Sequence, residues 1–113
     1  MLKKIECYIQ PAKFEEVKEA LAKGGVKGMT VYECRGFGRS RGYTEDETPA
    51  AETKFRPKVK IEIVADEAEV DSIITTIKRL ARTGRIGDGK IFVLPVEDAL
   101  RIRTDEVGRR AIH

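Results

Sequence analysis

An internal repeat constrains the fold of this chain more than any other feature of its sequence. The triplet Lys4-Ile5-Glu6 recurs as Lys60-Ile61-Glu62, and at the same offset the apolar residues Phe14, Val17 and Leu21 recur as Val70, Ile73 and Ile77. Each half therefore contains a strand pattern of period two followed by an amphipathic helix. Two strand–helix–strand units in series predict a ferredoxin-like α+β sandwich, with an antiparallel four-stranded sheet and both helices on one face.

Hydrophobic periodicity also sets the expected elements. We expect strands at residues 4–9, 29–34, 58–64 and 91–94, a helix from Phe14 that Gly24-Gly25 closes, and a second helix with its apolar stripe at residues 70–80. The start of the second helix carries the acidic residues Asp66, Glu67 and Glu69, whose negative charges interact favourably with the helix dipole. Both helices cover one face of the sheet. The other face, which would carry Tyr8 and Glu62, must therefore be exposed to solvent or covered by another subunit.

Composition places the chain among soluble globular proteins, with 41% hydrophobic and 36% charged residues. No apolar run approaches the roughly 20 residues needed to cross a bilayer, and the N-terminus leads directly into a strand pattern without a cleavage site. We therefore expect a cytoplasmic protein with no membrane insertion. The net charge of +3 fits a phosphate ligand or plain solubility better than extended nucleic-acid binding.

The cysteines and the histidine argue against metal and nucleophilic chemistry. Cys7 and Cys34 both fall in apolar strand-like stretches, so we expect two buried thiols rather than a disulfide or a metal pair. His113 is the single histidine and the last residue. The chain therefore has no Cys/His cluster of metal-ligand spacing and no histidine to pair with a nucleophile.

Residues 83–90, Thr-Gly-Arg-Ile-Gly-Asp-Gly-Lys, form a glycine-rich basic loop that leads into a strand-like run. Glycines allow close approach of the backbone to a ligand, and their N–H groups can form an anion-binding nest to which Lys90 adds a charge. The loop is not a Walker A motif, because Lys90 is followed by Ile91 and a strand rather than by a hydroxyl residue and a helix. The alternative is an ordinary helix-to-strand turn in which Gly84 caps the helix.

Residues 37–57 form a long polar segment without periodicity. Loops longer than about 12 to 15 residues are usually functional or disordered, so this segment is a candidate interaction element. Its charges balance, which argues against a simple nucleic-acid arm. The alternative is a flexible surface excursion with no partner.

The order of these parts resembles the PII signal-transduction family of trimeric nitrogen-regulatory proteins over essentially the whole chain. The resemblance rests on Gly28-Met29-Thr30-Val31, Gly36-Phe37-Gly38-Arg39, the run from Pro57 to Val64, the run from Thr83 to Val93, and Arg101-Ile102-Arg103-Thr104. It implies one domain over residues 1–113, in which 37–57 is the mobile partner-binding loop, 83–90 grips phosphates and 97–113 is the C-terminal segment. It also implies a homotrimer with ATP or ADP in clefts between subunits.

The resemblance assigns site residues position by position. The phosphates would be held by Gly87, Asp88, Gly89 and Lys90, together with Arg101 and Arg103 of the adjacent subunit. They would be flanked by Gly36, Phe37, Gly38 and Arg39. The adenine would be contacted by Thr30, Glu62, Ile63 and Val64. Tyr8 stands where a small aliphatic residue is common and would reshape the adenine pocket. Planar arginine forks and backbone amides suit phosphate oxygens.

Two departures from the family pattern bear on regulation. The usual glutamine of the magnesium and 2-oxoglutarate site is Ser40 here, whose hydroxyl is too short to replace an amide oxygen, whereas Lys58 is kept as a carboxylate or phosphate partner. Magnesium can accompany the nucleotide, but Ser40 argues against 2-oxoglutarate sensing. Residues 47–52, Glu-Thr-Pro-Ala-Ala-Glu, contain no tyrosine where the family is uridylylated, and Tyr43 is not an equivalent, which argues against that modification.

The sequence therefore predicts a non-enzymatic regulator that controls a membrane transporter or a metabolic enzyme through residues 37–57. One alternative is a PII-like sensor of adenine nucleotides and another small effector, for example bicarbonate, that does not respond to 2-oxoglutarate. A slow nucleotide hydrolase using Asp88 and Glu62 lacks a convincing base or arginine finger. A ferredoxin-like RNA-binding module would need stacking aromatics, for which Tyr8 and Tyr32 are the candidates.

Overall fold

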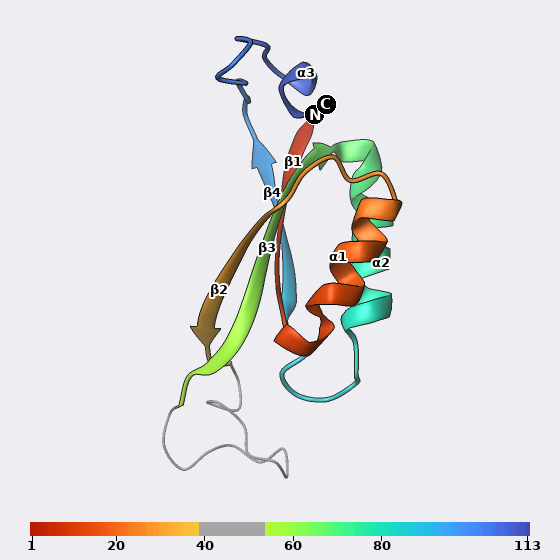
Figure 1. Ribbon diagram of the computed structural model, residues 1–113, viewed down its shortest axis with the longest axis vertical. Helices are drawn as coiled ribbons and strands as arrows, with labels where there is room; N and C mark the ends of the chain where they lie inside the picture. Colours follow the sequence, from red (N-terminus) through yellow and green to blue (C-terminus); the bar gives the residue numbers. More distant parts are fainter. Residues whose placement is uncertain (39–53) are drawn as a thin grey trace.

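The computed structural model describes residues 1–38 and 54–113, and its two long helices lie in one layer against a sheet (Figure 1). The elements are β1 (Leu2–Ile9), η1 (Pro11–Lys13), α1 (Phe14–Lys23), β2 (Thr30–Gly36), β3 (Arg56–Asp66), α2 (Glu67–Ala81), β4 (Lys90–Val96) and α3 (Arg109–Ile112). Each predicted strand and helix is present. The strands at residues 58–64 and 91–94 are longer than predicted, because β3 and β4 continue pairing beyond the strictly alternating residues.

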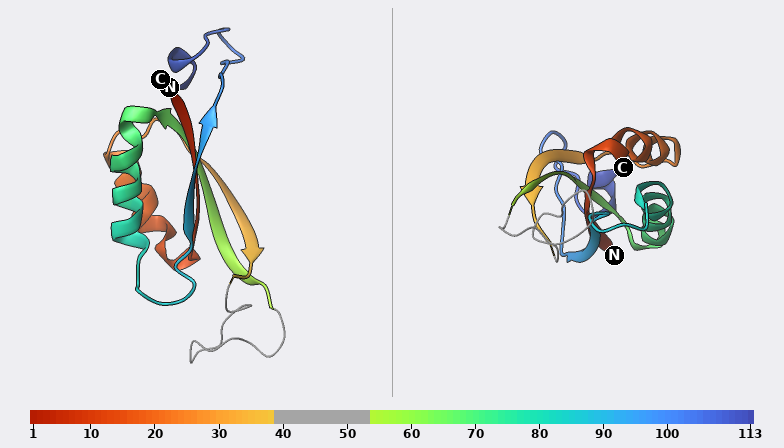
Figure 2. Two further views of the ribbon diagram at one scale, coloured as in Figure 1. Left: turned by 180° about the vertical axis from the view of Figure 1, so that it is seen from behind. Right: turned by 90° about the horizontal axis from the view of Figure 1, so that it is seen from below.

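Within the described residues, four strands form one antiparallel sheet in the order β2-β3-β1-β4. Ile5 of β1 pairs with Ile63 of β3 on one side and with Val93 of β4 on the other. Both long helices cover the same face of the sheet, as the view from below shows (Figure 2). This order and layering confirm the predicted ferredoxin-like fold.

The core lies between the sheet and the two long helices. Period-two alternation turns Ile5, Cys7 and Ile9 of β1 toward the helices, and Val59, Ile61 and Ile63 of β3 join them. The helical stripe adds Val17, Leu21, Val70, Ile73 and Ile77. Burying each branched side chain contributes about 1.5–3 kcal/mol relative to leaving it exposed, so these residues are the main source of stability.

The two cysteines differ in burial. Both are free thiols, and Cys7 is fully buried, which raises its pKa to about 11 because desolvation disfavours the thiolate. The prediction that Cys34 is also buried is wrong, since it is half-buried. Cys34 lies on the edge strand β2 opposite Lys58, and its Sγ is 3.6 Å from the Lys58 carbonyl oxygen. An edge strand has a neighbour on one side only, which leaves such a side chain partly accessible.

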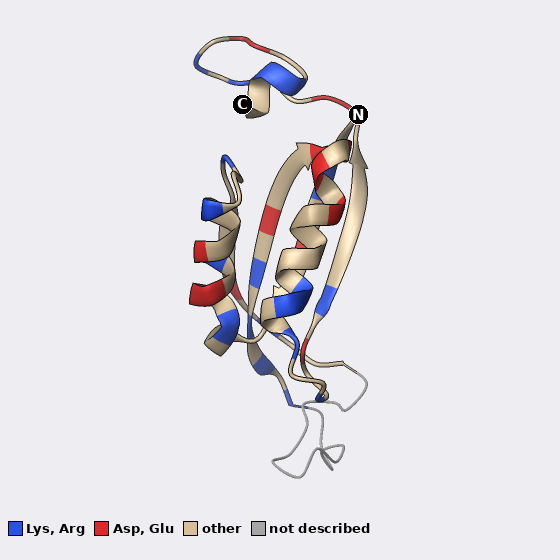
Figure 3. Ribbon diagram, turned by 90° about the vertical axis from the view of Figure 1, so that its right-hand side faces the viewer, with Lys and Arg blue, Asp and Glu red and all other residues tan. Residues whose placement is uncertain are grey.

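The C-terminal residues return to the N-terminal end of β1 (Figure 1). Asp66, at the end of β3, is 8% exposed and accepts from Arg109 Nε at 2.9 Å, with His113 Nε2 at 3.0 Å from its other oxygen. These contacts lower the pKa of Asp66, the bond with His113 being the main cause. Asp66 makes no side-chain cap bond to α2, and its carboxylate contacts Arg109 and His113 of the C-terminal segment. Figure 3 shows the basic residues at α3 in that segment.

Candidate functional site

The loop before β4 is held by the carboxylate of Asp88. Its Oδ2 accepts from the backbone N–H groups of Thr83 at 2.8 Å and Gly84 at 2.9 Å, and its Oδ1 accepts from the Thr83 hydroxyl. Desolvation opposes ionisation, but the bonds from Thr83 and Gly84 prevail and lower the pKa of Asp88. The carboxylate is thus occupied by its own loop. The structure therefore gives Asp88 the role of positioning the loop, because a carboxylate that faced a bound phosphate would repel the phosphate.

Two glycines of this loop adopt backbone conformations that side chains rarely accept. Gly87 has φ +102° and Gly89 has φ +101°. A Cβ on Gly89 would lie 1.6 Å from the carbonyl oxygen of Tyr8, so the loop packs directly against the β1 backbone. Only glycine permits this approach.

Lys58 connects the same loop to the sheet. Its Nζ donates to the Gly87 carbonyl oxygen at 2.7 Å. Burial lowers the pKa of Lys58, while the nearby charge of Asp88 acts in the opposite direction. The sequence indicated Lys58 as a partner for an anion but gave no sign that it binds the loop itself.

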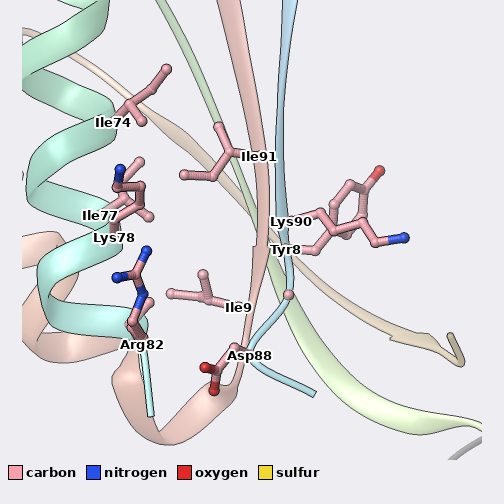
Figure 4. A pocket seen from close by; sticks show the side chains of 11 residues that line it. Tyr8, Ile9, Ile74, Ile77, Lys78, Arg82, Asp88, Lys90 and Ile91 are labelled. Carbon is pink, nitrogen blue, oxygen red and sulfur yellow. The ribbon is translucent and has the colours of Figure 1, made fainter. Parts of the chain in front are cut away.

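Lys90 is the first residue of β4 and pairs with Tyr8. Both side chains point away from the helices, to the open face of the sheet (Figure 4). Exposed Lys90 therefore lies at the junction between the glycine loop and the open face, where a phosphate on the loop amides could meet its ammonium group.

The open face carries a compact charge network with aromatic neighbours. Lys60 Nζ is 2.8 Å from Glu62 and 3.6 Å from Glu6, and Lys4 Nζ is 3.4 Å from Glu62. The bond from Lys60 is the main cause that lowers the pKa of Glu62. The Lys60 ammonium also lies over the rings of Tyr8 and Tyr32, at 5.8 and 5.2 Å from their centroids, and Phe92 packs edge-on against Tyr8.

The residues expected to contact adenine lie near one end of the β2–β3 pairing. Thr30 pairs with Glu62 as the first pair of that register, so Ile63 and Val64 follow where β2 has not yet begun. The Ile63 side chain is 2% exposed and belongs to the core, which leaves its backbone as the accessible part. Glu62 is engaged by Lys60, Lys4 and the Tyr32 hydroxyl.

Arg101 and Arg103 lie in the C-terminal segment, at the opposite end of the sheet from the glycine loop (Figure 1). Arg101 donates to Glu106 Oε1 at 3.1 Å and to the carbonyl oxygen of His113. A single subunit therefore does not bring these arginines to Gly87–Lys90.

Gly36, Phe37 and Gly38 lie at the far end of β2. The Phe37 ring packs against Phe55 at 5.3 Å between centroids, a contact that the sequence did not reveal. The predicted site residues Arg39 and Ser40, and residues 39–53 of the predicted loop, lie outside the described residues.

A pocket of about 370 Å³ lies between α2 and the β1–β4 pair (Figure 4). Its apolar wall consists of Ile9, Ile74, Ile77, Ala81 and Ile91, and its polar residues include Lys78, Arg82 and Asp88. Among residues 1–38 and 54–113, no group of three or more acidic, cysteine or histidine side chains could hold a metal ion. No helix in this part of the chain has the length and apolar character to span a membrane.

Comparison with known sequences decides the family. A sequence model described as "Nitrogen regulatory protein P-II" matches residues 2–106. The chain belongs to the P-II family. It is similar to the nitrogen regulatory proteins P-II of Azospirillum brasilense and Rhodospirillum rubrum, each 54% identical over 112 residues, covering 98% of this chain and 100% of the relative.

A P-II structure matches the fold as well. The crystal structure of Arabidopsis thaliana PII bound to citrate has a TM-score of 0.79 and 45% identity, covering 98% of this chain and 89% of that one. P-II proteins are regulators rather than enzymes, so the chain is a signalling regulator of the nitrogen regulatory type. The predicted family and class of function are confirmed.

Proposed function

We propose that this P-II protein acts as a homotrimer that binds ATP or ADP between subunits and controls a partner transporter or metabolic enzyme through residues 37–57. The observation that carries the proposal is the glycine loop, whose backbone is fixed by Asp88, by the tight packing of Gly89 and by Lys58. A backbone fixed in advance needs little reorganisation to accept phosphate oxygens. The whole chain, residues 1–113, would act as one domain in the cytoplasm.

The position of the arginines supports a site shared between subunits. Arg101 and Arg103 lie far from Gly87–Lys90 in one subunit (Figure 1), so a neighbouring copy would have to supply them. The open face supports the same arrangement, since Phe92 is 50% and Tyr32 44% exposed beside a network of two lysines and two glutamates. Such a patch suits a subunit interface.

The adenine would lie against the backbone of Ile63 and Val64, with Thr30, Glu62 and Tyr8 around it. The backbone of β3 beyond the Thr30–Glu62 pair offers donors and acceptors to an adenine edge. Gly36, Phe37, Gly38 and Arg39 would flank the phosphates at the base of the long loop.

A small anionic effector would act beside the nucleotide, near Lys58 and Ser40, with magnesium as a companion of the nucleotide. The citrate bound to the Arabidopsis protein supports an anion as effector class. Because Ser40 replaces an amide side chain, we infer an effector other than 2-oxoglutarate, for example bicarbonate.

Calorimetric titration of ATP, ADP and AMP with magnesium, with and without 2-oxoglutarate, tests the proposal. We expect ATP and ADP to bind, 2-oxoglutarate to leave their affinity unchanged, and Lys90→Gln to weaken both about tenfold or more. Lys23→Gln, at the end of α1, is the matched control. Absence of nucleotide binding, or a monomer by light scattering, would overturn the shared site, while tighter ATP binding with 2-oxoglutarate would overturn the effector assignment.

A further inference from the structure

The pocket between α2 and the β1–β4 pair lies on the helix side of the sheet. The side chains of Tyr8 and Lys90 point away from it to the open face (Figure 4). The lining of the pocket nevertheless includes Tyr8, Asp88, Gly89 and Lys90, which the proposed function places at the nucleotide, so the two sites adjoin along this stretch of chain. An inference about the helix side of the pocket goes beyond the proposed function, and a titration without nucleotide tests it separately.

The lining combines an apolar wall with cations. Five aliphatic side chains, Ile9, Ile74, Ile77, Ala81 and Ile91, form the wall, and the volume of about 370 Å³ is within the usual range of small-molecule sites, about 300–1,000 Å³. Ile9, Ile77 and Ala81 are buried, so this wall belongs to the packed hydrophobic core.

Two cations at the C-terminal end of α2 border the pocket. Lys78 belongs to the last turn of the helix, and Arg82 is the capping residue that follows it. Both are exposed, and neither forms a salt bridge within the described part of the chain, although Arg82 lies close enough to Asp88 for their charges to interact. Asp88 is the acid on the facing wall, and its two oxygens already accept three hydrogen bonds from Thr83 and Gly84 (Figure 4). Lys78 and Arg82 are thus the cations on the helix side of the pocket that a ligand can reach.

We propose that this pocket binds a small organic anion with an apolar body, of the class of a medium-chain carboxylate. The apolar body lies along Ile74, Ile77 and Ile91, and the anionic head lies beside Lys78 and Arg82. Neither a bare inorganic anion nor a neutral hydrocarbon matches both parts of the lining. Cations at a helix C-terminus also stabilise the helix dipole, and the test separates that structural role from ligand binding.

Octanoate is the probe, titrated into the full-length protein without nucleotide and followed by NMR of labelled isoleucine methyl groups. We expect shifts at Ile9, Ile74, Ile77 and Ile91, with Ile5 and Ile63 as internal controls elsewhere in the core. Lys78→Gln combined with Arg82→Gln should weaken octanoate binding about tenfold, the effect of losing about 1.4 kcal/mol of charge-assisted contact. Arg79→Gln on the same helix, outside the lining, should leave the affinity unchanged.

The neutral analogue 1-octanol should bind the wild type about tenfold more weakly than octanoate, and should not distinguish the wild type from the double variant. Absence of shifts at Ile74 and Ile91 would overturn the proposal. Equal octanoate affinity in the wild type and the double variant would overturn it too, because the cations would then act only on the helix.

Discussion

The ammonium nitrogen of Lys58 lies 2.7 Å from the carbonyl oxygen of Gly87. This hydrogen bond joins β3, which leads out of the segment 39–53, to the loop that precedes β4. The strand that follows the proposed partner-binding segment is therefore in direct contact with the loop proposed to bind the nucleotide. A phosphate or carboxylate that attracts Lys58 would compete with the Gly87 carbonyl, which gives a route from effector to loop.

Replacing Lys58 with Met should loosen the loop before β4. The substitution keeps most of the aliphatic chain but removes the donor, and loss of a hydrogen bond from a charged group costs about 1.5–3 kcal/mol, reduced here by partial exposure. We expect faster hydrogen exchange of the residue 84–90 amides and nucleotide binding weakened about tenfold. Lys3→Met on β1 is the control, and unchanged exchange in the loop would contradict the role of Lys58.

Gly89→Ala should destabilise the protein more than Gly84→Ala. Both glycines have positive φ, but a Cβ at Gly89 meets the Tyr8 backbone at 1.6 Å, whereas nothing lies within 4 Å of a Cβ at Gly84. We expect a loss of about 3 kcal/mol or more in the free energy of unfolding for Gly89→Ala and about 1 kcal/mol for Gly84→Ala. Urea unfolding measures both, and equal losses would show that the contact with Tyr8 is unimportant.

Asp88→Asn should destabilise the loop in a pH-dependent manner. The folded-state pKa of Asp88 lies below its ordinary value, so its stabilisation is present above about pH 4 and is lost as the pH falls through the folded pKa. An Asn amide cannot accept from Thr83 and Gly84 with both of its polar atoms. We expect a loss of about 1–2 kcal/mol at pH 7 that shrinks toward pH 3. Urea unfolding at both pH values checks this, and a loss independent of pH would exclude the charge as its cause.

His113→Ala should release the end of the chain from Asp66. The substitution removes the His113 ring at 3.0 Å from Asp66, the main cause of the lowered pKa of that carboxyl. We expect severalfold faster trypsin cleavage after Arg109 and Arg110, and a lower melting temperature. Lys13→Ala, in η1 at the opposite end of β1 from the Leu2–Asp66 pair, is the control. Cleavage at the wild-type rate would show that His113 does not hold the segment.

The sequence predicted the fold because its alternation and helical spacing repeat in both halves. Ile5 and Ile61 lie where period-two patterning puts them, and Val70, Ile73 and Ile77 form the predicted helical stripe. The glycine loop was also recognisable, because Gly87 and Gly89 supply conformations that few other residues accept.

Contacts between distant polar residues escaped prediction. Nothing in the local sequence pattern indicates that Lys58 donates a hydrogen bond to Gly87 or that the Asp66 carboxylate contacts the His113 ring. Both contacts depend on how the sheet brings separate segments together. Cys34 was misjudged because its apolar neighbours do not reveal that β2 is an edge strand. The role of Asp88 as an acceptor for its own loop was likewise visible only in three dimensions.

β3 pairs with both β1 and β2, and its successive side chains point to opposite faces of the sheet. Val59, Ile61 and Ile63 face the helices, while Lys58, Lys60 and Glu62 face the other way. A one-residue insertion or deletion in the middle of this strand would exchange the two sets, placing charges in the core and isoleucines on the open face. Length variation among natural relatives should therefore be excluded from residues 58–63 and confined to the connections between elements.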